Sequence, residues 1–373
     1  MSNTPDVVVV KDSFMTSVRK KAAAFGLPRI IIVLFFISLF VIAGFAGMNL
    51  PSFFGDVLRR WGIWGVLVLA MVPSIQSGNG PNFGVSVGIL GGLVGAVFSI
   101  DLRYSGAFDF VTNPALFALT GALVAMVIGV SLAIVMGILY GMLLNKVKGS
   151  EMAITVYVGF SAVALFNILW ARMPITATIA ILPGTGFGLR QMINLRDDFG
   201  GAFDDLGAFD IGAMTVRPGL LFVFFSMCFF MWLFTRSRTG MMMSSAGLNP
   251  SYARASGINV DRMRIIGTTT STALGAFGII VYAQSFGFMQ MYTAPLMMGF
   301  TAVASVLIGG ASVRRAKVFD VLLGAFLFNG ILTIALPLTT ELVPDIPGIP
   351  EMLRIIITNG IILYALTRAK GGR

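Results

Sequence analysis

The chain has 373 residues, of which 57% are hydrophobic and only 11% are charged, and its mean hydropathy is +0.90. Soluble globular proteins carry about 25% charged residues, so this chain could not cover its own surface in water, and a soluble globular protein is excluded. The sequence contains no His and a single Cys. A single Cys excludes an internal disulfide, and the lack of the commonest metal ligand and general base disfavours metal catalysis. We predict no catalytic residue and no metal site.

Long charge-free stretches predict transmembrane helices. A helix needs about 20 mostly apolar residues to cross a bilayer, and the apolar runs are continuous rather than alternating, which disfavours a β-barrel. The predicted fold is all-α, a polytopic bundle of about ten spans with an inverted internal repeat. The third and eighth spans are rich in Gly and short enough to be broken or re-entrant. The spans are expected near residues 29–49, 57–76, 83–100, 115–144, 152–171, 219–235, 265–283, 298–312, 318–338 and 352–367.

The distribution of Lys and Arg predicts how the chain is threaded through the membrane. Residues 1–28 are polar and too long and mixed for a cleaved signal sequence, so they are expected to form a cytoplasmic segment before a transmembrane domain at 29–373. With ten spans and both termini inside, 18 Lys and Arg fall on the cytoplasmic side and 8 outside, as the positive-inside rule requires. The loop at 172–217 is then external and the loop at 236–264 cytoplasmic. Because the basic residues are divided among the loops rather than clustered on one face, no nucleic-acid partner is expected.

Two Gly-rich segments, 78–92 and 297–310, each interrupt a run of spans. Five spans separate them, so the two copies would lie in opposite orientations, a pattern that points to a transport path at the membrane midplane. The alternative is that small residues only let helices pack closely. If a transport path runs here, uncharged amides and nearby aromatic rings are expected to line it. The alternative is that the amides only form hydrogen bonds with neighbouring helices. The candidates are Gln76, Asn79, Asn82, Phe83, Gln284, Phe286 and Gln290.

The chemistry that the sequence lacks is equally informative. No phosphate-binding loop of the G-x-x-x-x-G-K-[ST] type occurs, so any nucleotide that drives the protein must bind another chain. The predicted spans contain no central acidic residue, which argues against a proton- or sodium-coupled carrier and against an intramembrane enzyme. We therefore expect no cofactor on this chain, with ATP and Mg²⁺ on a partner.

The cytoplasmic loop at 236–264 is longer than a connection between two helices requires. Asn249 can cap a short helix that starts at Pro250, and Gly257 can end that helix by adopting a positive φ. Such a helix would lie along the membrane surface. It could be a plain connection or could dock a partner.

The segment from Gly247 to Ile258 resembles the G-x-N-x-x-A-A-x-x-S-G-I signature of ribose-type ATP-binding-cassette importer permeases, a family of monosaccharide, autoinducer and nucleoside systems. Further resemblance lies in residues 306–312 and 140–144. Two positions depart from the family pattern: Gly84 stands where the sugar branch has an acid, and Val313 begins a basic segment where the family has a Gly-rich tail. The resemblance implies that the signature segment couples the permease to its ATPase. The coupling residues would be Gly247, Asn249, Tyr252, Ala253, Arg254, Ser256, Gly257 and Ile258.

The same resemblance implies a permease subunit that moves a sugar-like or nucleoside-like solute across a bacterial inner membrane. Its partners would be an ATP-binding-cassette ATPase subunit, a second permease subunit in a homo- or heterodimer, an extracytoplasmic solute-binding protein and membrane lipid. The external loop at 172–217 either meets the binding protein or is a plain solvated cap. The alternatives from other classes are a secondary carrier and a membrane-embedded enzyme of lipid metabolism.

Overall fold

The computed structural model describes residues 27–147, 149–173, 191–292 and 294–342, together with isolated residues beyond 342. Three predicted regions lie wholly or largely outside the described residues: the N-terminal segment 1–28, the part of the external loop at 174–190, and the tenth span at 352–367.

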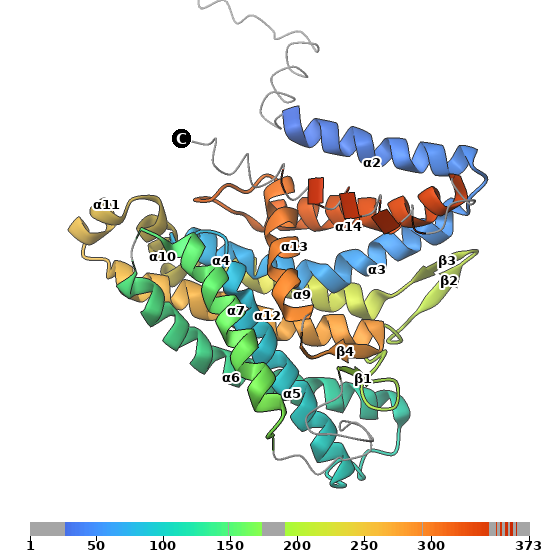
Figure 1. Cartoon of the computed structure of the whole chain (residues 1–373), viewed down its shortest axis with the longest axis horizontal. Helices are drawn as coiled ribbons and strands as arrows, with labels where there is room; N and C mark the ends of the chain where they lie inside the picture. Colours follow the sequence, from blue (N-terminus) through green and yellow to red (C-terminus); the bar gives the residue numbers. More distant parts are fainter. Residues whose placement is uncertain are drawn as a thin grey trace, which may run out of the picture.

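The described residues form a helical bundle with two small antiparallel ribbons, as Figure 1 shows. The helical elements are α2 (Leu27–Phe45), α3 (Leu50–Leu69), α4 (Met71–Gln76), the 3-10 turn η1 (Phe83–Val85), α5 (Ser86–Tyr104), α6 (Pro114–Lys146), α7 (Glu151–Trp170), α9 (Pro218–Arg236), α10 (Arg238–Leu248), α11 (Pro250–Ala255), α12 (Val260–Phe286), α13 (Ala294–Ile308) and α14 (Val318–Leu342). The ribbons pair β1 (Met192–Asn194) with β4 (Phe288–Gln290) and β2 (Phe209–Ile211) with β3 (Met214–Val216).

The all-α polytopic fold predicted from the sequence is confirmed, but the described residues do not reach ten complete spans. Seven helical segments are long and apolar enough to cross a membrane, and two shorter apolar stretches lie in α2 (Arg29–Phe45) and α13 (Pro295–Ile308). The third predicted span is long enough to cross a membrane: η1 and α5 together make a 22-residue apolar segment, in which the backbone at Gly84 is not helical. The eighth predicted span, α13, has only 15 residues.

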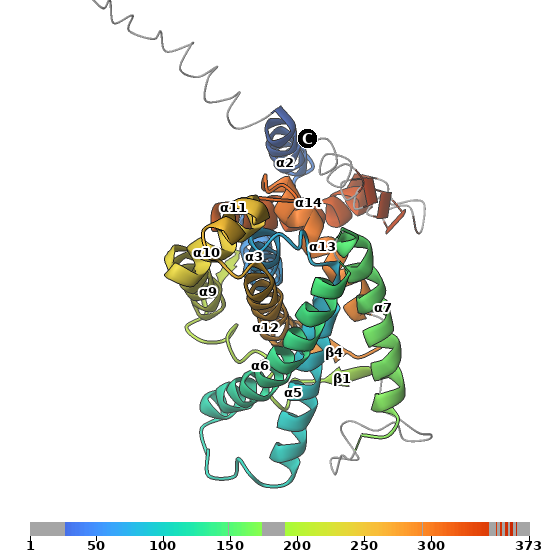
Figure 2. The same cartoon turned by 90° about the vertical axis from the view of Figure 1, so that its left-hand side faces the viewer.

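The centre of the bundle is formed by α5, α6 and α12, with α3 and α14 beside them and α2 on the outside against α14 (Figures 1 and 2). Close approach at this centre depends on glycine. A methyl group at Gly92 of α5 would lie 2.5 Å from the carbonyl oxygen of Ala276 on α12. A methyl group at Gly129 of α6 would lie 2.9 Å from the Cα of Gly92. Lipid tails are as apolar as the side chains, so helices in a membrane associate through close packing of this kind rather than through the hydrophobic effect.

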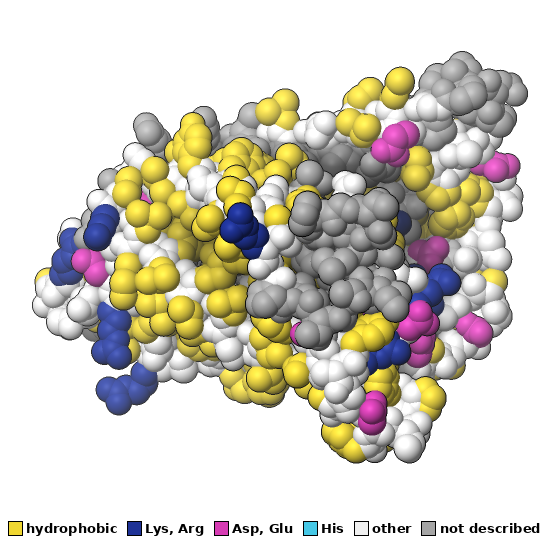
Figure 3. Space-filling model, turned by 60° about the horizontal axis from the view of Figure 1, so that its bottom comes forward, with side chains coloured by type: hydrophobic (Ala, Val, Ile, Leu, Met, Phe, Trp, Pro, Cys, Tyr) yellow, Lys and Arg dark blue, Asp and Glu magenta, His cyan; other side chains and the backbone are white. Residues whose placement is uncertain are grey.

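The surface view in Figure 3 separates side chains by type along the bundle. Several Lys and Arg side chains lie at the end that carries α10 and α11, hydrophobic side chains fill most of the middle, and most acidic side chains of this face, together with a few Lys and Arg, lie toward the opposite end. The basic side chains at the α10 and α11 end agree with the predicted excess of Lys and Arg on the cytoplasmic side of the membrane.

The central glycine contacts generate a stability prediction. Gly92→Ala should destabilise the bundle, because overpacking a tight interface costs about 1–3 kcal/mol. The matched control is Gly159→Ala on α7, where the nearest atom to an added methyl group is 3.4 Å away, an ordinary contact distance. Thermal unfolding in detergent should show a lower Tm for Gly92→Ala than for Gly159→Ala. Equal Tm values would contradict close glycine packing at the centre.

Candidate functional site

A buried break interrupts the helices between α4 and η1. Residues 77–82 are not helical; Gly78 and Gly80 have φ of 84° and 76°, a region open mainly to glycine, and Pro81 offers no backbone N–H. Asn79 and Asn82, two predicted path residues, are only 2% and 1% exposed. The sequence Gly-Asn-Gly-Pro therefore bends the chain while directing two amides into the protein.

The amide of Asn82 is held by side chains from two central helices. Its Nδ2 donates to Ser271 Oγ of α12 at 2.9 Å, and Tyr140 of α6 donates its hydroxyl hydrogen to Asn82 Oδ1 at 2.9 Å. Ser271 is 0% exposed and Tyr140 4% exposed. These three uncharged groups form a polar cluster inside the bundle that can offer both donors and acceptors.

The amide of Asn79 meets a different part of α12. Its Nδ2 donates to the carbonyl oxygen of Arg264 at 3.1 Å and to Thr268 Oγ1 at 2.8 Å, while Arg264 Nε donates to Asn79 Oδ1 at 2.6 Å. Arg264 also forms an ion pair with Glu151, the first residue of α7. Arg264 is buried, with 7% of its surface exposed.

The two Gly-rich segments of the predicted repeat contact each other. The Phe83 ring packs on the Phe300 ring of α13 with centroids 5.2 Å apart, and Ser86 Oγ donates to the carbonyl oxygen of Pro295 at 2.7 Å. A methyl group at Gly299 would lie 2.7 Å from the carbonyl oxygen of Phe83. The first helix break and α13 thus share one buried interface.

The remaining predicted path residues lie elsewhere. Gln284 is 13 residues after Ser271 on α12, which separates them by roughly 20 Å at 1.5 Å per residue. Phe286 stacks its ring near that of Tyr282, with centroids 4.4 Å apart, and Gln290 is exposed on β4. Gln76 is half-buried; its Nε2 donates to the carbonyl oxygen of Ala316 at 2.8 Å. Its Oε1 has no partner among the described residues. The structure therefore gathers Asn79, Asn82 and Phe83 around the helix break and does not bring Gln284, Phe286 or Gln290 to them.

Gln284 belongs to a second buried polar cluster centred on Asp204, which is 1% exposed. Gln284 Oε1 accepts from the backbone N–H of Phe203 at 3.1 Å, and its Nε2 lies 3.3 Å from Asp204 Oδ1. Asp204 Oδ2 pairs with Arg59 at 2.9 Å and with Arg217 at 3.5 Å. These contacts fasten the 191–217 segment to α3 and α12.

A neighbouring acid in the same segment, Asp198, pairs with Arg103 at the end of α5. Burial raises the pKa of the Asp198 carboxyl above its usual range, and the Arg103 guanidinium offsets part of that rise. The 191–217 segment is therefore fixed to the bundle by ionic contacts in at least two places. Its predicted role in meeting a binding protein is untested.

The predicted short helix of the 236–264 loop is present as α11. Asn249 Oδ1 accepts from the backbone N–H of Tyr252 at 3.0 Å, Pro250 is the first helical residue, and Gly257 adopts a φ of 78°. Ala253 is fully buried, while Tyr252 is 64% exposed and free to contact a partner. The local fold of this segment agrees with the prediction, and its role in coupling remains a prediction.

The end of α10 packs directly on the helix break. A methyl group at Gly78 would lie 2.9 Å from Gly247 Cα, and one at Gly247 would lie 2.7 Å from the backbone nitrogen of Gly78. Neither position has room for a side chain. The predicted coupling segment and the predicted path segment are thus in direct contact.

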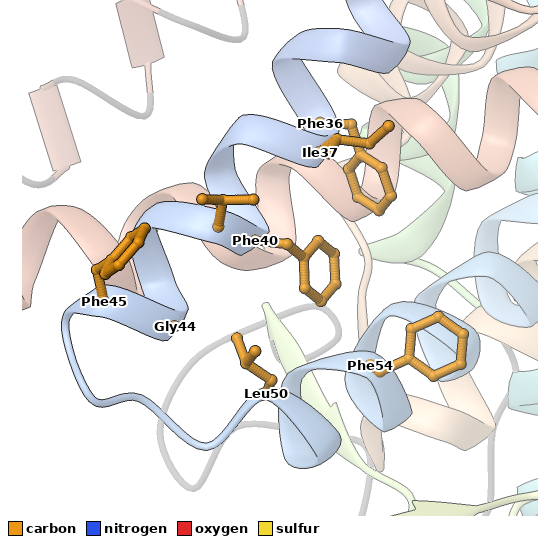
Figure 4. A pocket seen from close by; sticks show the side chains of 8 residues that line it. Phe36, Ile37, Phe40, Gly44, Phe45, Leu50 and Phe54 are labelled. Carbon is orange, nitrogen blue, oxygen red and sulfur yellow. The ribbon is translucent and has the colours of Figure 1, made fainter.

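Two cavities differ sharply in chemistry. One of about 650 Å³ lies beside the helix break and has polar lining residues, including Asn79, Glu151 and Arg314. The other, of about 540 Å³, lies between α2 and α3 (Figure 4). Its lining is entirely apolar: Phe36, Ile37, Phe40, Val41, Gly44, Phe45, Leu50 and Phe54. An apolar groove on a membrane helix suits an acyl chain and offers no hydrogen bond to a polar solute.

Sequence reasoning missed several residues that complete these clusters. Tyr140 was noted only as part of the family resemblance. Arg264 and Glu151 were considered only as charges that indicate the topology. The polar positions Thr268, Ser271 and Thr272 recur at helical spacing in one apolar span, a signal that would have marked the buried face of α12. Among the described residues, no three His, Cys, Asp or Glu side chains are placed to hold a metal ion.

Comparison with known proteins places these features in a family context. The family described as "Branched-chain amino acid transport system / permease component" matches residues 53–366. Among curated proteins, the chain is 29% identical over 153 residues to "Nucleoside ABC transporter permease protein NupB" of Lactococcus lactis subsp. cremoris. That alignment covers 40% of this chain and 38% of the relative, so the chain matches about two fifths of the relative's length. No solved structure matches the chain.

The cluster around Asp204 generates a second stability prediction. Asp204→Ala should lower the free energy of unfolding by about 3 kcal/mol, because it leaves Arg59 and Arg217 without their buried partner. The matched control is Asp210→Ala, an exposed acid whose carboxylate bonds Thr215, for which a change within about 0.5 kcal/mol is expected. Thermal unfolding in detergent should show a marked fall in Tm only for Asp204→Ala. Equal Tm values for the two variants would contradict the fastening role.

Proposed function

Because the chain belongs to the family of branched-chain amino acid transport system permease components, we propose that it is the membrane-spanning subunit of an ATP-binding-cassette importer for a nucleoside-like or sugar-like solute. The observation that carries the proposal is the buried, amide-lined helix break at 77–82, which touches the predicted coupling segment through Gly78 and Gly247. A broken helix that lines a polar interior is the arrangement expected at a transport path.

The groups around the break favour an uncharged polar solute. Asn82, Tyr140 and Ser271 offer hydrogen bonds without charge, and the rings of Phe83 and Phe300 offer apolar surface on which a flat base or sugar ring could rest. Arg264, which bonds Asn79 of the break, is paired with Glu151. An amino acid solute would need charged partners for both its ends. The printed name of the Lactococcus relative supports the nucleoside-like class.

The proposal includes partners and an orientation. ATP and Mg²⁺ would bind a separate ATPase subunit docked on α11, and a second permease subunit, identical or not, would complete the path. A solute-binding protein would deliver the solute from outside. The end with α10 and α11 would face the cytoplasm together with both termini, which the gathering of basic side chains at that end supports. The chain itself would perform no covalent chemistry.

Transport assays test this proposal. Proteoliposomes containing the permease with its ATPase, supplied with the binding protein, should take up radiolabelled uridine in an ATP-dependent way, and ribose or leucine less. Asn82→Leu should lower uptake at least tenfold while ATPase association is kept, since the substitution removes the amide from the cluster. Uptake of every probe without ATP would indicate a secondary carrier instead. No uptake of any probe by the wild-type complex would overturn the importer assignment.

Docking of the ATPase on α11 can be tested at Gly257. Its φ is 78° and nothing in this chain lies within 4 Å of a methyl group added there, so a substitution acts on this chain through backbone conformation rather than through a steric clash. Gly257→Val should abolish co-purification with the ATPase, because β-branched residues resist positive φ. The matched control Gly257→Asn should retain most of it, because Asn tolerates that conformation. Both variants should fold and insert, with Gly257→Val less stable than Gly257→Asn by about 1–3 kcal/mol at most. Normal ATPase binding by Gly257→Val would remove the docking assignment.

A further inference from the structure

Three side chains from three separate elements meet at one point beside the helix break. Asn79 comes from the break itself, Glu151 from the start of α7, and Arg264 from the first turns of α12. Arg264 Nε donates to Asn79 Oδ1 at 2.6 Å, its Nη2 forms an ion pair with Glu151, and its own carbonyl oxygen accepts from Asn79 Nδ2 at 3.1 Å. Arg264 is thus joined to both other residues, and it is the member that connects α7 to the break.

The burial of this trio makes it a cohesive unit. The side chains of Arg264 and Glu151 are only 9% and 19% exposed, and Asn79 is 2% exposed. Separating the pair would leave the buried guanidinium of Arg264 without its charged partner, which is costly. The trio therefore resists opening on its own, and any movement that separates α7 from α12 must supply energy from elsewhere.

The position of the trio relative to the polar cavity of about 650 Å³ is informative. That cavity is lined by the break at Gly78–Gly80, by residues 149–153 at the start of α7, by the end of α10 and by Val313 and Arg314. Asn79 and Glu151 belong to its lining, and Arg264 joins them from α12. Thr268, which bonds Asn79, is buried, and so is Thr272 four residues later on α12. Ser271, which bonds Asn82, lies seven residues beyond Arg264 on α12, about 10 Å along the helix, so the trio lies at the wall of the cavity and the cluster of Asn82, Tyr140 and Ser271 lies further along α12.

A mechanical connection joins this trio to the segment on which the ATPase is proposed to dock. Gly247, at the end of α10, contacts the backbone of the break at Gly78, one residue before Asn79. Side chains at either position would collide with the other backbone, so the two backbones are in direct contact. A displacement of α10 and α11 toward the break would therefore press on the residue before Asn79.

We propose that Arg264, Asn79 and Glu151 form the cytoplasmic gate of the solute path, that the polar cavity is the exit vestibule below it, and that the Gly247–Gly78 contact opens the gate when the ATPase moves α11. This inference rests on the importer function proposed above. Arg264 is a positioning residue: it holds the break against α7 and keeps the path closed while the ATPase is at rest.

If the trio is a gate, weakening it should uncouple uridine movement from ATP hydrolysis while the complex still assembles. Glu151→Gln removes one charge with almost no change in shape, and Arg264→Ala removes the central member. Both should keep ATPase association, and both should leak preloaded uridine from proteoliposomes without ATP at least tenfold faster than wild type. The number of ATP molecules hydrolysed per uridine moved should rise at least tenfold. The matched control Arg262→Ala, an exposed arginine two positions earlier on α12, should leave both quantities unchanged.

A charge-swapped double variant separates a gate from a merely structural ion pair. Glu151→Arg combined with Arg264→Glu restores the pair in reverse, and Asn79 can donate its amide hydrogen to the new carboxylate. The double variant should recover low leakage and most of the coupling. Should Arg264→Ala fail to fold, the leak and coupling ratio of Glu151→Gln still decide the question. Wild-type leakage and coupling in Glu151→Gln would overturn the gate, as would a double variant that leaks as much as Arg264→Ala. Failure of the importer assignment is seen separately, as absence of ATP-dependent uptake by the wild-type complex.

Discussion

The rest of the structure depends on one constraint, the need to satisfy backbone polar groups that cannot reach water. In the hydrocarbon region irregular backbone is tolerated only where protein surrounds it. The break after α4 meets this demand locally: the N–H groups of Ser77, Gly78 and Asn79 donate to the carbonyl oxygens of Pro73, Ile75 and Ser74 at 3.0–3.2 Å. Ser74 Oγ donates to the carbonyl oxygen of Gly80 at 2.8 Å.

The neighbours of the break follow from the same constraint. Because the chain bends inside the bundle, α10, α12 and the start of α7 must close around it, and they do so with the backbone of Gly247, the side chain of Arg264 and the side chain of Glu151. The amides of the break then find partners on α12. A polar interior in this fold is a consequence of breaking a helix there.

Physical features that act over a few residues were predictable from the sequence. Charge-free runs marked the helices because a charge at the bilayer centre is costly, and α11 was predictable because an Asn cap, a first-turn Pro and a terminal Gly act within ten residues. The break at 77–82 was also signalled by its Gly and Pro.

Contacts between distant residues could not be predicted in this way. Gln284 was expected beside Asn82, yet it bonds Asp204, 80 positions earlier in the chain. Arg264 and Glu151 lie 113 positions apart, and nothing local to either residue identifies the other. Among the described residues seven helices rather than ten are long and apolar enough to cross a membrane; α13 has only 15 residues, and the tenth predicted span lies largely outside the described residues. Hydropathy indicates whether a segment lies in lipid or in water, but it does not determine where its helix begins and ends.

The two polar clusters occupy opposite ends of α12, and this arrangement gives the helix a mechanical role. α12 has 27 residues and is therefore about 40 Å long. At its far end Gln284 and Ser285 join Asp204, which also holds two arginines, so that end is fastened to α3 and to the 191–217 segment by several ionic and polar contacts. At the near end Arg264 makes one ion pair and a few hydrogen bonds. The near end is the one that touches α10 through the helix break. In the importer proposed above, a force applied at α11 would therefore reach α12 first near Arg264, about 30 Å from the cluster at Asp204.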